Sequence, residues 1–207
     1  MPPKDNGIVT DQLFLSIWLE RHARAQRQRH FHTLLQLFPF SQREQPQSQV
    51  SIHAVDSTEP PLLERPVNGP IDIEEVMETF AEYKGDDVAY QLESWWDVWL
   101  FQDDWKVTPA RISLSCFGPE FDNGTDRPLG EQEDIRIDFG VETPFLPQPQ
   151  VEGSPRMVQS NIKSLLRLVH EIDSALPVST RRLATESGEN FAERLQQALV
   201  SEGGSVQ

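Results

Sequence analysis

Tryptophan and acidic residues are interleaved in ESWWDVWLFQDDW, residues 93–105, which hold four of the chain's five tryptophans. If this segment is a β-strand, alternate side chains point to opposite faces of a sheet. One face is then almost entirely apolar and belongs against helices, while the other alternates carboxylates with indoles. The residues concerned are Glu93, Trp95, Asp97 and Trp99 on the second face, with Asp103 and Asp104 in an adjacent tight turn.

Three interpretations of this face remain open. Indoles beside carboxylates could bind sugar rings, two carboxylates could act together in catalysis, or the face could simply pack within the protein. The simplest catalytic pair is excluded by distance. Glu93 and Asp97 are four residues apart on a strand, or roughly 13 Å, whereas paired glycosidase carboxylates lie about 5–9.5 Å apart. Because tryptophan is enriched among binding hot spots, the six residues named above are candidates for contacting a protein partner.

A second uneven feature is RHARAQRQRHFHT, residues 21–33, in which arginines and histidines cluster and no acid occurs. The helix expected here begins near Ala23, so the arginines lie in its first turns, where positive charge opposes the helix dipole. A bound phosphate or carboxylate would relieve that conflict, because helix N-termini with nearby arginines hold anions well. The alternatives are docking of an acidic partner and pairing with the chain's own acids. The candidate anion-binding residues are Arg21, Arg24, Arg27 and Arg29.

Other motifs with a known chemistry do not fit. His30 and His32 are two residues apart and would point about 200° away from each other on a helix, so they cannot share a metal. The segment 122–133 has the length of a calcium loop, but Arg127 stands where glycine is required. Cys116 lies in an apolar strand and is expected to be an inert, buried small side chain. We therefore expect no metal and no cofactor.

The composition is that of a globular protein with a strong negative charge. Eighteen Lys and Arg face 33 Asp and Glu, which gives a formal net charge of −15 and a pI near 4.7. This charge disfavours nucleic-acid binding and suits a basic partner. No apolar run reaches the roughly 18 residues of a membrane-spanning helix, and a signal-peptide pattern is absent, so we expect a cytoplasmic protein without membrane association. One domain is expected at 11–200, with flexible ends at 1–10 and 201–207.

Hydrophobic periodicity and turn residues predict a chain of mixed α and β structure. Asp72 is the expected N-cap of the second helix, and Ser154 is that of the third. Strands are expected at 12–21, 50–56, 60–67, 87–101, 105–118 and 134–141, and helices at about 23–38, 72–85, 154–176 and 189–199. The apolar stripe of the third helix comprises Val158, Ile162, Leu165, Leu166, Val169, Ile172 and Leu176.

The predicted fold class is α+β with a mostly antiparallel sheet. The first six elements follow the β-α-β-β-α-β order of a ferredoxin-like core, which a C-terminal hairpin or meander and two C-terminal helices would extend. Without a catalytic motif, the expected function is that of a non-enzymatic protein-binding module of an accessory, regulatory or inhibitor-like kind, and a homodimer is also compatible. The alternative is a small-molecule or anion-binding protein, which could be an enzyme, using the 21–29 stretch.

Overall fold

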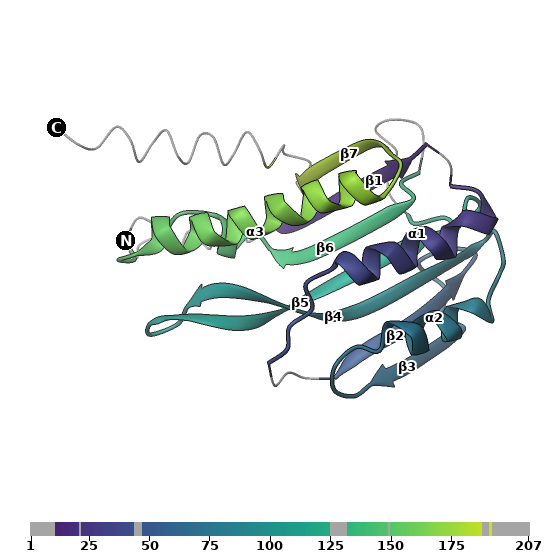
Figure 1. The fold of residues 1–207 in the computed structure, drawn as a ribbon, viewed down its shortest axis with the longest axis horizontal. Coiled ribbons are helices and arrows are strands. Elements are labelled where there is room, and N and C mark those ends of the chain that lie inside the picture. The colour runs from purple at the N-terminus through teal and green to yellow at the C-terminus, as the bar shows by residue number, and fades with distance from the viewer. Residues whose placement is uncertain are drawn as a thin grey trace, which may run out of the picture.

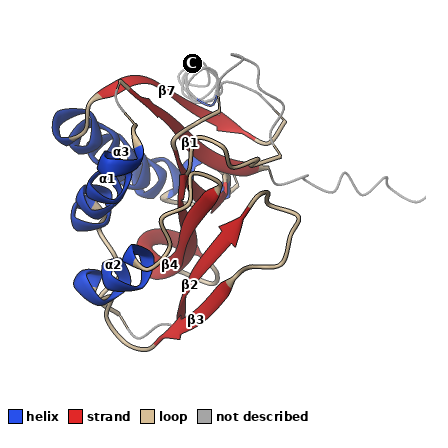
Figure 2. Ribbon diagram, turned by 90° about the vertical axis from the view of Figure 1, so that its right-hand side faces the viewer, coloured by secondary structure: helices blue, strands red, loops and turns tan. Residues whose placement is uncertain are grey.

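The computed structural model describes residues 11–20, 22–43, 47–124, 132–148, 150–187 and 191. They form a seven-stranded antiparallel sheet with three α-helices on one of its faces (Figures 1 and 2), which confirms the predicted α+β class. The strands are β1 Gln12–Leu19, β2 Ser48–Ala54, β3 Leu63–Val67, β4 Val88–Phe101, β5 Trp105–Phe117, β6 Ile135–Val141 and β7 Val178–Thr185. The helices are α1 Arg24–Leu37, α2 Ile73–Ala81 and α3 Ser154–Ala175, with a short 3-10 helix at Thr143–Phe145.

The strands follow the order β3-β2-β4-β5-β6-β1-β7 across the sheet. The predicted ferredoxin-like core is not confirmed, because β1 pairs with β6 and β7, and β5 and β6 separate it from β4. β4, β5 and β6 are consecutive neighbours, as the predicted meander requires. The sequence does not predict β7, since VSTRRLAT is polar over most of its length and occupies an edge of the sheet, where little burial is needed.

Trp96 lies in the core between the sheet and the helices. Its side chain is 1% exposed, and its ring packs beside Phe38, Phe139 and Phe145 at centroid distances of 6.2, 5.1 and 5.8 Å. The burial pattern of β4 alternates from Tyr90 onward, so the apolar side of this strand faces the helices as predicted. Large aromatic surfaces of this kind contribute strongly to the stability of a core.

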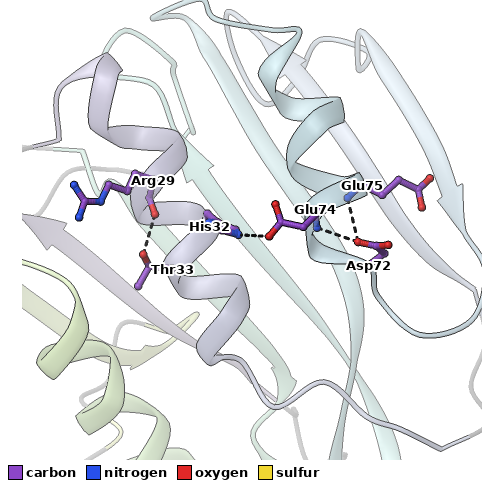
Figure 3. Close-up of polar contacts among 6 residues, drawn as sticks. All are labelled: Arg29, His32, Thr33, Asp72, Glu74 and Glu75. Carbon is purple, nitrogen blue, oxygen red and sulfur yellow. Dashed lines mark hydrogen bonds and ion pairs between the residues drawn. The ribbon is translucent and has the colours of Figure 1, made fainter.

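The first two helices begin and pack as their sequences predict. Phe31 and Leu34 on α1 are fully buried against the sheet. Asp72 caps α2, and its Oδ1 accepts hydrogen bonds from the backbone N–H groups of Glu74 and Glu75 (Figure 3). The cap satisfies donors that would otherwise lack a partner within the helix, and the two glutamates complement the helix dipole.

The long helix α3 departs from its prediction in two ways. Ser154 is the first helical residue and not the N-cap, since the preceding Gly153 takes the cap position at φ 79°, a left-handed conformation that glycine tolerates. The apolar stripe is rotated slightly from the predicted one. Leu166 is 54% exposed, whereas Leu168 and the polar Asn161 are buried. The burial of Asn161 has a specific cause in the hairpin described below.

The predicted last helix at 189–199 lies outside the described residues apart from Phe191, and so do both predicted flexible ends. Phe191 is buried, and its ring meets that of Phe145 edge-on at a centroid distance of 6.3 Å. Among the described helices, none has the combination of length and apolar character needed to span a bilayer.

Candidate functional site

The β4–β5 hairpin extends well past its neighbours in the sheet (Figure 1). β2 pairs with β4 no further than Glu93, and β6 pairs with β5 only from Ser113 onward. We call residues 94–112 the hairpin arm. Its two strands pair with each other over eight positions, from 94 with 112 to 101 with 105, which corresponds to roughly 25 Å. The candidate partner-binding residues, except Glu93 at its base, belong to this arm.

One edge of the hairpin arm, along β4, is occupied by hydrogen bonds, and the other, along β5, is interrupted by a proline. On the β4 edge, the Trp95 carbonyl accepts a hydrogen bond from the Ser41 backbone N–H at 2.8 Å. Further along, the Asn161 side chain accepts from the Trp99 N–H at 2.8 Å and donates to the Trp99 carbonyl at 2.9 Å. On the β5 strand, Pro109 has no N–H to offer. A partner is therefore expected to meet the faces and tip of the arm and not to add a strand to it.

The two acids on the tryptophan-bearing face are neutralised within the molecule. Glu93 forms an ion pair with Arg111. The Asp97 carboxylate accepts hydrogen bonds from Ser41 Oγ at 2.7 Å and from Arg43 Nε at 3.2 Å. These contacts fix the side chains but remove much of their net charge, because each carboxylate is matched by a guanidinium.

The indoles of Trp95 and Trp99 are half-buried, and by the alternation of β4 they lie on the face opposite to that of the buried Trp96. Arg111 is the cross-strand partner of Trp95, and Val107 is that of Trp99. Cross-strand pairs of this kind share one face and cover part of each ring. The structure thus brings the four predicted face residues together along one side of β4, with their acids already paired.

The tip of the hairpin arm differs from this face, since it is both acidic and exposed. Asp103 and Asp104 are exposed in the turn, and in the described part of the chain neither forms an ion pair. Phe101 is 41% exposed, and its ring lies 5.5 Å from that of Trp105. Trp105 is held in place by its indole N–H, which donates to the Glu152 carbonyl at 2.7 Å.

A groove runs beside the base of the hairpin arm, between residues 37–42 and α3. Its volume is about 490 Å³, and Trp96 and Leu168 contribute to its apolar lining. The Trp96 indole N–H has no hydrogen-bond partner in the described part of the chain. Asp97 and the ion-paired Arg167 and Glu171 supply charged groups to the same groove. The sequence does not reveal this groove, because its walls come from segments more than a hundred residues apart.

The arginines of the 21–33 stretch do not form one cluster. Arg27 is 1% exposed, whereas Arg29 is exposed and points away from α2 (Figure 3). Arg21 and the side chain of Arg24 lie outside the described part of the structure. His32 contacts Glu74 at 3.0 Å and so links α1 to α2. Of the four candidate anion-binding residues, the structure describes the side chains of Arg27 and Arg29, and of these two only Arg27 is buried.

Arg27 is held inside the protein by uncharged oxygen atoms. Its Nη1 donates to the carbonyls of Gly85 at 3.0 Å and Val88 at 3.1 Å. Its Nη2 donates to the Tyr90 hydroxyl at 2.8 Å, and the guanidinium carbon lies 4.6 Å from the centre of the Tyr90 ring. A cation–π contact of this type offsets part of the cost of burying the charge. Arg27 Nε is buried and has no partner in the described part of the chain.

Burial disfavours the charged forms of three further side chains near α1, which are His22, His30 and Cys116. His22 and His30 stack with ring centroids 5.8 Å apart, and burial lowers the pKa of both imidazoles. Cys116 is fully buried, as predicted, and burial raises the pKa of its thiol far above the ordinary range. A buried, protonated thiol is a poor nucleophile, so Cys116 is not a candidate catalytic residue.

No protein-family model, curated protein or solved structure matches this chain. Among the described residues, His, Cys, Asp and Glu side chains do not gather in threes at any point that could hold a metal ion. The function proposed below therefore follows from the geometry and charge of the hairpin arm and its surroundings.

Proposed function

We propose that this chain is a non-enzymatic protein-binding module and that the tip and faces of the hairpin arm contact its partner. The observation that carries the proposal is the exposed tip, where Phe101 and Trp105 lie beside Asp103 and Asp104 on a projection that neighbouring strands do not cover. An accessory, regulatory or inhibitor-like role suits such a surface, because it offers recognition without a group placed for catalysis.

The aromatic residues at the tip supply an anchor that is already ordered. The hydrogen bond from Trp105 to Glu152 fixes the indole, and the neighbouring Phe101 ring packs against it. A side chain that is immobile before binding loses little conformational freedom when the partner arrives. Aromatic residues are also over-represented among the residues that dominate binding energy at protein interfaces.

The charge of the tip favours a basic partner. Asp103 and Asp104 are exposed and form no ion pair in the described part of the chain, so with the exposed Lys106 they leave the tip with a net negative charge. Glu93 and Asp97, in contrast, are each paired with an arginine. The net charge of −15 reinforces this local field and would speed the encounter with a positively charged protein. We propose that Trp95 and Trp99 contact the partner along one face of the arm, while Asp103 and Asp104 at the tip orient it by their charge.

A sugar-binding platform is supported less well by the same geometry. Hydroxyl recognition needs carboxylate oxygens that are available to a ligand, and the carboxylates of Glu93 and Asp97 are held by Arg111 and Arg43. A second copy of this chain is a further possible occupant of the arm. The experiments on the arm must therefore distinguish binding of a different protein from dimerisation of this chain.

The proposal is tested by affinity purification from an extract of the source cells, with quantitative mass spectrometry of what is retained. The arm variants are Phe101→Ser and the double charge reversal Asp103→Lys with Asp104→Lys. The matched controls are Leu166→Ser, at a side chain 54% exposed on α3, and Glu78→Lys, at an exposed acid on α2.

We expect one basic protein to be retained by the native chain and by both controls, and to be lost from both arm variants. Its recovery should also fall as salt is raised, because exposed charges are screened. Equal recovery with the arm variants, or loss with the controls instead, would show that the arm is not the binding surface.

A further inference from the structure

A second cavity lies at the opposite end of the sheet from the tip of the hairpin arm. Its volume is about 400 Å³, and the described residues that line it are Ala25, Arg27, Gln28, Lys84 and Tyr90. Two of these five residues are cationic and none is acidic. In a chain with a net charge of −15, a cavity with this lining is a local reversal of the overall field.

Within the part of the chain that the structure describes, the buried guanidinium in this cavity wall has no counter-ion. Arg27 is 1% exposed, and its three hydrogen-bond acceptors are two backbone carbonyls and a tyrosine hydroxyl. In the described part of the chain it forms no ion pair, and its Nε–H has no acceptor. Burial of a charge without a counter-ion is unfavourable, so a negative group beside this wall would be stabilising.

The start of α1 adds a further positive contribution. The N-cap residue Ala23 offers no side-chain acceptor, and the first turn of this 14-residue helix contains no acid. Its backbone N–H groups and the positive end of the helix dipole are therefore not neutralised by a capping carboxylate. Ala25, the second residue of the helix, lines the cavity. Helix starts of this kind hold oxyanions when other donors are nearby.

We infer that this cavity binds the phosphate group of a small molecule. Lys84 supplies an exposed cation at the cavity. The Gln28 amide adds no available donor, because its Nε2 already donates to the Phe80 carbonyl and to the Tyr90 hydroxyl, each at 3.2 Å. Arg27 supplies a fixed positive charge in the wall. A phosphate fills only part of 400 Å³, which leaves room for the organic portion of a phosphate ester. This site is independent of the proposed partner-binding surface.

The distance between the two sites makes them separable by mutation. Tyr90 in the cavity and Leu100 on the hairpin arm are ten residues apart on β4, or roughly 33 Å. Lys106 is the cross-strand partner of Leu100 and is exposed. Lys106→Glu thus makes the same change of charge as Lys84→Glu at a position remote from the cavity, and serves as its control.

The test is a titration of the ¹⁵N-labelled full chain with inorganic phosphate, with sodium chloride adjusted to keep the ionic strength constant. The expected result is saturable shifts of the backbone amides of Ala25, Gln28 and Lys84 and of the Arg27 Nε–H signal. Lys84→Glu should weaken phosphate binding by at least about tenfold, while its spectrum without phosphate stays that of a folded chain. Lys106→Glu should leave the affinity within about twofold.

Two outcomes would overturn the inference. One is the absence of saturable shifts at these positions in the native chain. The other is equal weakening by Lys84→Glu and Lys106→Glu, which would mean that phosphate responds only to overall charge. Loss of partner capture in the arm variants, or its persistence, has no bearing on either result.

Discussion

Replacement of Asn161 by alanine should loosen the hairpin arm from the rest of the protein. The side chain of Asn161 is 3% exposed on α3 and makes three hydrogen bonds. It accepts from the Trp99 N–H at 2.8 Å, donates to the Trp99 carbonyl at 2.9 Å, and donates to the Pro144 carbonyl at 2.8 Å. One asparagine thus takes the place of a neighbouring strand at the β4 edge and ties the arm to α3.

The size of the effect follows from these three bonds. A buried hydrogen bond contributes about 1 kcal/mol net, and a buried partner left without a hydrogen bond costs about 1–3 kcal/mol. Asn161→Ala removes all three hydrogen bonds and leaves the Trp99 N–H, the Trp99 carbonyl and the Pro144 carbonyl without their side-chain partner. The free energy of unfolding should therefore fall by about 3 kcal/mol. For a chain of this size, that loss lowers the midpoint of thermal unfolding by roughly 6–12 °C.

The assay is urea denaturation of the native chain and the variant, with hydrogen exchange of the Trp99 amide as a local measurement. Gln159→Ala, two residues earlier and exposed on the same helix, is the control and should change stability by less than about 0.5 kcal/mol. A loss below about 1 kcal/mol for Asn161→Ala, or unchanged protection of the Trp99 amide, would refute the view that Asn161 holds the arm.

Two further predictions concern the buried groups near α1. Burial lowers the pKa of His22 and His30 in the folded chain below 6.5, so the unfolded chain binds more protons at mildly acidic pH, and stability present above pH 6.5 should be lost as the pH falls through the folded-state pKa values. Urea denaturation across this range measures the slope, and a double His22→Gln, His30→Gln variant with an unchanged slope would contradict this assignment. Burial also raises the pKa of the Cys116 thiol, so iodoacetamide should label Cys116 only after unfolding. Intact mass measures the label, and rapid labelling of the native chain would show that the thiol is accessible.

The sequence predicts much of the fold where local patterns decide the structure. Alternation in 93–105 correctly separates Trp96 from the face of Trp95 and Trp99, because a strand in a half-covered sheet must bury one side. The Asp72 cap is likewise a local feature. Strand order is a different matter, since the pairing of β1 with β6 and β7 depends on contacts between distant segments that no local pattern encodes.

The candidate sites are predicted only in part, and two signals in the sequence would have improved them. Arg27 lies on the same helical stripe as Phe31 and Leu34, at spacings of four and seven, so its burial follows from the pattern. The tight turn at 102–104 also sets the register that places Arg111 opposite Trp95, within reach of Glu93. The groove at Trp96 carries no such signal, because it is formed by residues 37–42, β4 and α3, which are distant from one another in sequence.

The central claim, that the hairpin arm holds a different protein, is tested most directly by photo-crosslinking in the source cells. A photoreactive phenylalanine analogue replaces Phe101 at the tip of the arm or, as control, the comparably exposed Leu166 on α3. We predict one adduct with a basic protein from position 101 and none of that mass from position 166. The same adducts from both positions, or none from position 101, would contradict the claim. An adduct of twice the chain's own mass would instead make the arm a contact between two copies.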